Sequence, residues 1–203
     1  MDSEKQKPQK TPPSLDNPFE AIQKLASDLR DPDGGCPWDI EQTHKSLVEN
    51  LIEETYEVVD AIENLDETDE KTWLELMEEL GDLFFQVVIH AQLASEKNRF
   101  TLEDVARTIT EKLIFRHPHV CSSGVSAQDT SEVLKNWEAL KRREKKEKNR
   151  AEHLFSGIPT HLPALLKSYR MGQKAARVNF DWKDKEGHTQ LVNKILKEIL
   201  DRS

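Results

Sequence analysis

Two acidic pairs have the spacing and the surroundings of a cation site. Glu54 and Glu57 lie three residues apart in "LIEETYEVVDAI", and Glu79 and Asp82 repeat this spacing in "MEELGDLFFQVVIHA". Like charges at helical spacing repel each other by about 0.2–0.5 kcal/mol. A carboxylate that faces an apolar core costs more, unless a positive group compensates it. The two pairs therefore predict that something positive binds between them.

Most acidic residues on helices are solvated, and we expect this of Glu63, Glu67, Glu70 and Glu75. The four residues of the two pairs differ, because no lysine or arginine lies on the same helix face one turn away. Unpaired carboxylates in a core would have strongly raised pKa values. Mg²⁺ takes oxygen ligands and usually brings phosphate with it. A magnesium site is therefore favoured over a solvated surface.

The elements that must position these residues are predicted to be helices. Glycine is scarce, with seven residues in 203, and no stretch shows the alternation of a strand. Apolar periodicity and breakers predict an all-α chain, with Thr68 or Asp69 capping the third helix and Thr101 the fourth. The predicted helices cover 19–30, about 41 or 46 to 64, 69–97, 101–117, about 130–150, 164–178 and 188–200.

The third predicted helix carries a narrow polar line. From Leu80 to Ala91 it is apolar nearly all round, which is typical of a buried helix. Four polar side chains nevertheless follow one line along it at helical spacing: Glu79, Asp82, Gln86 and His90. We expect His90 to be a satisfied core histidine rather than a second layer around the site, and His44 is a candidate neighbour of the site.

Composition narrows the possible partners and the location. The formal net charge of −9 argues against duplex nucleic acid as the main ligand. No apolar run approaches the length of a membrane span, so no membrane partner is expected. Cys36 and Cys121 are far apart and form no CxxC pattern, which favours a reducing, cytoplasmic location. Residues 1–18 are predicted to be a flexible tail, because they are rich in Pro and Lys.

Four motifs, in order, closely resemble the MazG family of nucleoside triphosphate pyrophosphohydrolases, within the all-α NTP pyrophosphatase superfamily. They are "GGCPWDIEQTH", "LIEETYEVVDAI", "EELGDLFFQVVIHA" and "EKLIFRHPHV", and the resemblance covers about residues 19–182. It implies hydrolysis of a nucleoside triphosphate to a monophosphate and diphosphate, in order to clear non-standard or surplus nucleotides. It also implies a four-helix bundle assembled across a homodimer or higher oligomer, with Mg²⁺ bound and Mn²⁺ as a substitute.

The resemblance also assigns roles to individual acidic residues. By motif position, Glu54, Glu57, Glu79 and Asp82 would be the metal ligands. Glu53 would orient or deprotonate the attacking water. The catalytic helical domain would then cover residues 19–150, followed by a connector and C-terminal helical extension at 151–203.

The resemblance further implies a set of substrate-binding residues. Lys112 and Arg116 match the family's basic positions and share a helix face, so they could meet phosphate oxygens. Trp137 matches a tryptophan near the nucleotide, and Lys141 could reach substrate phosphates. Trp38 has two open interpretations: a turn whose tryptophan caps the core, or a loop that stacks on the base or contacts a partner chain.

Two departures from the family pattern qualify these expectations. Phe115 stands where the family usually has a basic residue, so one phosphate contact is missing. In "VNKILKEILDRS", Lys197 and Glu198 replace the glutamate pair that would begin a second acidic signature, so we expect one acidic set per chain.

Two alternative functions remain open. One is a relative restricted to pyrimidine deoxynucleotides or phosphoribosyl-ATP, against which the GGCPWD motif argues. The other is a nucleotide-binding helical module without turnover, against which the complete acidic set argues.

Overall fold

The computed structural model describes residues 10–121, 129, 133, 137, 140, 154–176, 178 and 180. The chain divides into two compact units, Met1–Val125 and Ser126–Ser203. Within the described residues the regular structure is helical and no strand occurs, which confirms the all-α prediction. The predicted domain boundaries after residues 18 and 150 stay predictions.

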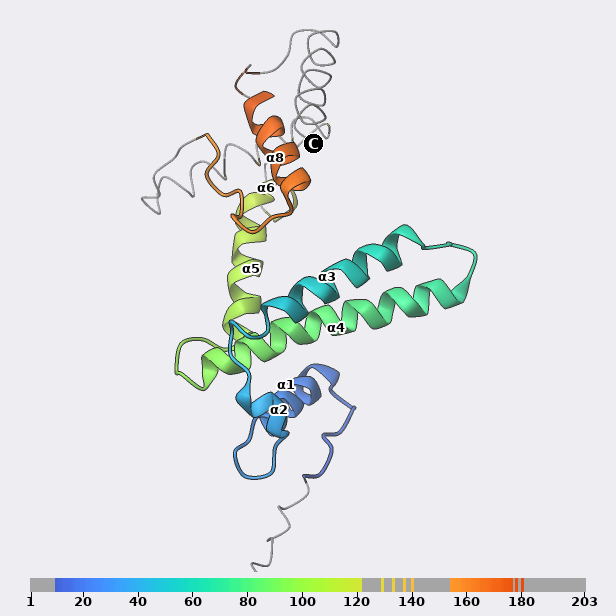
Figure 1. Ribbon diagram of the computed structural model, residues 1–203, viewed down its shortest axis with the longest axis vertical. Helices are drawn as coiled ribbons and strands as arrows, with labels where there is room; N and C mark the ends of the chain where they lie inside the picture. Colours follow the sequence, from blue (N-terminus) through green and yellow to red (C-terminus); the bar gives the residue numbers. More distant parts are fainter. Residues whose placement is uncertain are drawn as a thin grey trace, which may run out of the picture. The chain divides into compact units, whose positions relative to one another are not determined.

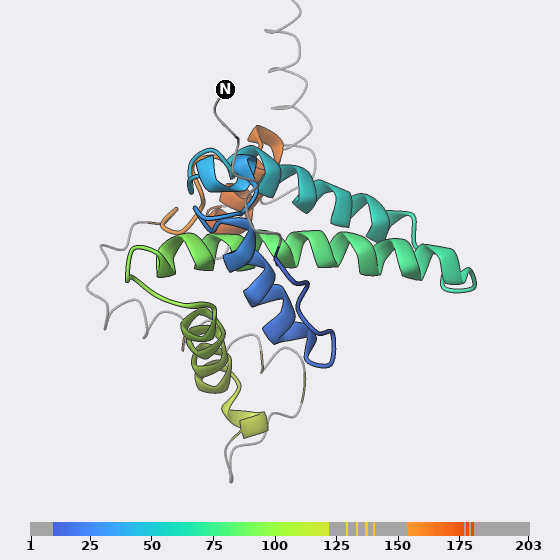
Figure 2. The same cartoon turned by 90° about the horizontal axis from the view of Figure 1, so that it is seen from below.

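The first unit is organised around a long helical pair. Its helices are α1 (Pro18–Leu29), α2 (Pro37–Glu41), α3 (Val48–Glu63), α4 (Glu70–Ser95), α5 (Leu102–Arg116) and α6 (Pro118–Cys121). Helices α3 and α4 run side by side in opposite directions, joined by a short loop (Figure 1). Helix α1 packs across α4, and α5 follows at the far end of α4 (Figure 2).

Local side-chain contacts explain where the helices begin. Asp69 caps α4 by accepting a hydrogen bond from the backbone N–H of Lys71. Thr101 and Asp104 form a reciprocal capping box at α5, where an acidic first turn also suits the helix dipole. Both caps were predicted from the sequence, and both are confirmed.

The helix predicted to begin at about residue 41 or 46 begins at Val48, and the short helix α2 comes before it. Pro37 occupies the first turn of the short helix α2, where a missing N–H costs nothing. Thr43 and Ser46 then exchange hydrogen bonds between their side chains and each other's backbone N–H groups. These local bonds compete with helix formation, so α3 begins at Val48.

The GGCPWD motif forms a tight return at the end of α1. The backbone N–H of Gly35 donates to Asp31 O at 2.8 Å, and that of Cys36 donates to Leu29 O at 2.7 Å. A Cβ atom at Gly35 would lie only 2.4 Å from Leu29 O. Gly34 has a φ of 114°, a value that favours glycine. Both glycines are therefore required by backbone geometry.

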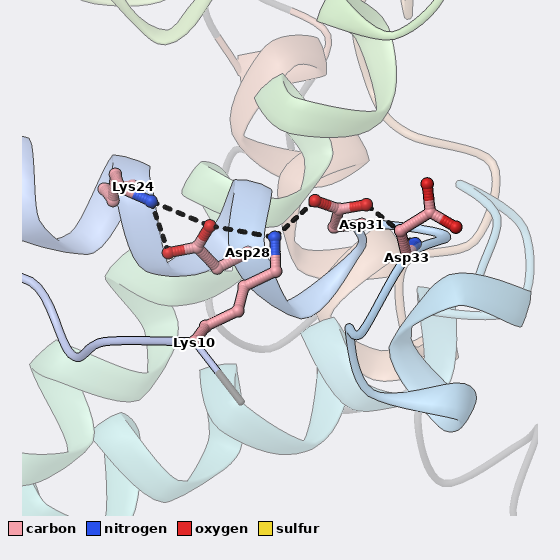
Figure 3. Close-up of polar contacts among 5 residues, drawn as sticks. All are labelled: Lys10, Lys24, Asp28, Asp31 and Asp33. Atoms are coloured by element: carbon pink, nitrogen blue, oxygen red, sulfur yellow. Dashed lines mark hydrogen bonds and ion pairs between the residues drawn. The ribbon is translucent and has the colours of Figure 1, made fainter. Parts of the chain in front are cut away.

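Two polar networks hold this return in place. Lys10 contacts Asp28 and Asp31, and Lys24 pairs with Asp28 at 2.6 Å (Figure 3). The Arg30 guanidinium binds both carboxylate oxygens of Glu96 at 2.7 Å and also donates to backbone carbonyls at Asp39 and Gln42. These contacts of the buried Arg30 side chain connect the end of α1 to α2 and to the end of α4.

The buried core lies where α1, the start of α3 and α4 meet, and consists of Ala26, Leu47, Val88, Ile89 and Leu93. Beyond this core, large apolar side chains on α3 and α4 are exposed. They are Ile52, Tyr56, Val59 and Ile62 on α3, and Leu74, Met77, Leu80, Phe84 and Val87 on α4. The prediction of a buried segment from Leu80 to Ala91 therefore holds only for part of it within one chain.

The second unit contains α8 (Ala164–Ala176), within the helix predicted over 164–178. Val133, Trp137 and Leu140 are helical, and the rest of the helix predicted over 130–150 lies outside the described residues, as does the one over 188–200. Cys36 and Cys121 are free thiols. In the described part of the chain, no helix is both long and apolar enough to cross a membrane.

Candidate functional site

Three of the four predicted ligands converge from two helices. Glu54 and Glu57 on α3 and Glu79 on α4 each offer one carboxylate oxygen, and these oxygens lie within 4.8 Å of one another. Glu54 and Glu79 are half-buried, whereas Glu57 is exposed. The i, i+3 spacing places Glu54 and Glu57 on one face of α3, and the antiparallel packing of α4 brings Glu79 opposite them.

The pKa of Glu54 is raised above its ordinary value of 4.5. Burial is the largest cause, followed by the adjacent carboxyl group of Glu57, with which it can share a proton. The negative charges of Asp82, Glu57 and Glu79 act in the same direction. Burial and the neighbouring carboxyl groups therefore all act against the ionised form of Glu54.

The pKa of Glu79 is raised for similar reasons. Burial contributes most, and the charges of Glu57 and Asp82 follow. Asp82 is exposed one turn after Glu79 on α4 and acts on both Glu54 and Glu79. The four carboxylates predicted to act together are thus one electrostatic group, of which three are within reach of a common ion.

This donor set suits a hard divalent cation. Mg²⁺ and Mn²⁺ prefer carboxylate and water oxygens, whereas softer ions select thiolate or imidazole ligands. Among the described residues the cluster consists of carboxylates, and burial and then the neighbouring carboxyl groups raise the pKa values of Glu54 and Glu79. The residues present therefore fit the predicted metal.

The other predicted residues of the first unit lie on three elements. Glu53 is exposed on α3 beside Glu54. Trp38 on α2 is 55% exposed, so it does not cap the core of this chain, and its contact with a base or a partner stays a prediction. Lys112 and Arg116 are half-buried one turn apart on α5. Their proposed roles toward substrate stay predictions.

The remaining predicted residues belong to the second unit. Trp137 is half-buried at a helical position, and Lys141 lies outside the described residues. Their roles also stay predictions.

The polar line of α4 contains two features that its pattern alone did not reveal. Gln86 is only 7% exposed, and its Oε1 has no hydrogen-bond partner among the described residues. His90, one turn further on, shares a hydrogen bond of 2.8 Å with His44, Nδ1 to Nδ1, between parallel rings. His90 is therefore a satisfied histidine, as expected. The signal for Gln86 was its place on a polar line within an apolar helix.

Comparison with known protein families agrees with this geometry. Residues 42–121 match the MazG nucleotide pyrophosphohydrolase domain. The matched range contains α3, α4 and all four carboxylates. The chain belongs to the MazG family.

MazG relatives from three bacteria resemble most of this chain. A nucleoside triphosphate pyrophosphohydrolase from Escherichia coli K12 is 44% identical over 167 residues, covering 82% of this chain and 60% of the relative. The nucleoside triphosphate pyrophosphohydrolase/pyrophosphatase MazG of Thermotoga maritima is 44% identical over 183 residues, covering 89% and 66%. A nucleoside triphosphate pyrophosphohydrolase from Mycobacterium tuberculosis is 41% identical over 142 residues, covering 68% and 41%. The chain thus spans less than two thirds of the length of these relatives.

Proposed function

We propose that this chain is a Mg²⁺-dependent nucleoside triphosphate pyrophosphohydrolase that converts NTP and water to NMP and diphosphate. The observation that carries the proposal is the convergence of Glu54, Glu57 and Glu79 from two helices, with ligand oxygens within 4.8 Å of one another. The relatives from Escherichia coli, Thermotoga maritima and Mycobacterium tuberculosis are named nucleoside triphosphate pyrophosphohydrolases, which supports the same reaction. The role would be to clear non-standard or surplus nucleotides.

In this proposal Glu54, Glu57, Glu79 and Asp82 hold Mg²⁺, for which Mn²⁺ can substitute. The bound cation would neutralise phosphate charge, which is most of what phosphoryl transfer needs from a protein site. The raised pKa values of Glu54 and Glu79 support this assignment, because a cation would remove the repulsion that causes part of each shift.

Glu53 is proposed to orient or deprotonate the attacking water. It follows the first turn of α3 directly before Glu54 and is exposed, so water can reach its carboxylate. A base must lie within hydrogen-bond reach of the proton that it takes. Its exposure beside the ligand set supports this proposal.

Substrate contacts are proposed for five residues from three parts of the chain. Lys112 and Arg116 share a face of α5 and would bind phosphate oxygens, since both are cationic donors. Trp38 is exposed and would stack on the base. Trp137 is proposed from the family resemblance, and Lys141 from its place in the basic run at 141–150.

A second copy of the chain is proposed to complete a four-helix bundle. Helices α3 and α4 expose a set of large apolar side chains that includes Ile52, Tyr56 and Ile62, together with Met77 and Phe84. Many large apolar side chains exposed on one pair of helices favour a surface that binds a partner. Pairing two α3–α4 hairpins would bury both sets.

The test is a diphosphate-release assay with standard and damaged NTPs and dNTPs, with and without Mg²⁺. Glu57→Ala and Asp82→Ala are expected to abolish release while circular dichroism shows unchanged helix content. Glu63→Ala, at the solvated end of the same helix α3, is the matched control and should keep full activity. Full turnover in either site variant would remove that residue from the site.

The substrate assay, calorimetry and light scattering together separate the alternatives. Release from pyrimidine dNTPs or phosphoribosyl-ATP alone would identify a restricted relative. Calorimetric binding of nucleotide without release would identify a non-catalytic module. A monodisperse, active monomer in light scattering would refute the dimer. A cytoplasmic location stays a prediction from the cysteine pattern.

A further inference from the structure

Gln86 is a buried polar residue whose side-chain oxygen is not hydrogen-bonded to any described residue. Its side chain is 7% exposed, and Oε1 has no hydrogen-bond partner among the described residues. Buried acceptors are almost always paired, and an unpaired one is destabilising. A methionine would fill nearly the same volume without this penalty. We therefore look for a hydrogen-bond donor that could pair with Gln86 Oε1.

The place of Gln86 on α4 indicates where that donor comes from. At about 100° per residue, Gln86 points within about 20° of Glu79 and about 40° of Asp82 around the helix axis. Long helical side chains also lean toward the helix N-terminus, so the amide extends over the turn that carries Asp82. Asp82 is exposed and Gln86 is buried, so this polar line runs from the surface of α4 into its buried part.

The groups around the acidic line limit which hydrogen-bond donors can reach Gln86 Oε1. The carboxylates of Glu79 and Asp82 are acceptors when ionised and cannot satisfy another acceptor. Substrate phosphate oxygens are acceptors as well. Water that hydrates a divalent cation donates strongly, and Mg²⁺ and Mn²⁺ keep several such waters when protein carboxylates bind them.

We propose that Gln86 is a positioning residue whose Oε1 accepts a hydrogen bond from water hydrating the cation held by Glu54, Glu57 and Glu79. The inference rests on the proposed metal site. Partners of this kind orient the ligands around an ion, and losing one typically weakens metal binding.

Gln86→Met separates this role from a structural one, because the two predict opposite effects. We expect Mn²⁺ alone, titrated by calorimetry without nucleotide, to bind about tenfold more weakly or worse. We also expect the Tm of the metal-free protein to rise by about 2–6 °C, since the unpaired acceptor is gone. Gln86→Glu keeps an acceptor oxygen and should retain Mn²⁺ binding.

Gln92→Met is the matched control on the same helix. Gln92 lies on another face of α4, and its amide already donates to Glu96 at 3.1 Å. We therefore expect unchanged Mn²⁺ affinity and no gain in Tm. This control shows whether any loss of affinity in Gln86→Met comes from the substitution itself or from its position.

Three results would overturn the inference. Wild-type Mn²⁺ affinity in Gln86→Met would do so, as would a lower metal-free Tm, which would mean that the amide is satisfied without metal. If Gln86→Met does not fold, NMR of the wild-type protein decides, because Mg²⁺ must shift the side-chain amide signals of Gln86. A wild-type protein that binds no Mn²⁺ would overturn the metal site as well, so the two failures are distinguishable.

Discussion

Neutralising Glu54 should stabilise the metal-free protein and weaken its response to Mg²⁺. The ligand oxygens of Glu54 and Glu57 lie within 4.8 Å. At that separation two unit charges repel by about 0.9 kcal/mol in water, and screening at physiological ionic strength leaves about half of this. Glu54→Gln therefore gains about 0.5 kcal/mol from Glu57 alone, or about 1–2 °C in Tm. Relief from Glu79 and Asp82 adds in the same direction.

Adding the cation should make the Tm of the wild-type protein higher than that of Glu54→Gln. A ligand at 100 times its dissociation constant stabilises the folded state by about 2.7 kcal/mol, which is about 5–10 °C for a chain of this length. Glu54→Gln has lost one ligand oxygen charge and should gain much less. The wild-type protein is thus expected to be the less stable one in EDTA and the more stable one in Mg²⁺.

Thermal unfolding followed by circular dichroism measures both effects. Each protein is unfolded in EDTA and in MgCl₂, with NaCl added to equalise ionic strength. Glu63→Gln, on the same helix but outside the cluster, should have the wild-type response in both buffers. The reasoning is refuted if Glu54→Gln has a lower Tm than the wild type in EDTA, or if Mg²⁺ raises both Tm values equally.

Four further predictions concern proton competition at the cluster, two glycines and His90. Because the pKa values of Glu54 and Glu79 are raised, protons compete with the cation, and Mg²⁺ affinity measured by calorimetry should fall from about pH 7.5 to about pH 5; a pH-independent affinity contradicts this. Gly35→Ala should lower the free energy of unfolding by about 1–3 kcal/mol, because the new Cβ meets backbone atoms. Gly81→Ala, where nothing lies within 4 Å, should instead gain about 0.5–1 kcal/mol in urea unfolding. The pKa of His90 is lowered by burial and then by the charge of His44, so its stabilising contribution is present above pH 6.5 and lost as pH falls through its folded-state pKa; a pH series of urea unfolding on His90→Phe should lack that slope.

The helices and their caps follow from local chemistry and could be predicted from the sequence. Asp69 and Thr101 cap α4 and α5 because each places an oxygen against backbone N–H groups of the next turn. The shared face of Glu54 and Glu57 is likewise a property of one helix. Such features involve residues a few positions apart, and the spacing itself encodes them.

Contacts between elements required the tertiary structure. The approach of Glu79 to the α3 carboxylates depends on how α3 packs against α4, which no local spacing encodes. The same holds for the bond between His44 and His90 and for the unpaired Oε1 of Gln86, since burial depends on every element packed around a side chain. The sequence determined which faces carry charge, and only packing decided which charges meet, because contact is a property of pairs of elements.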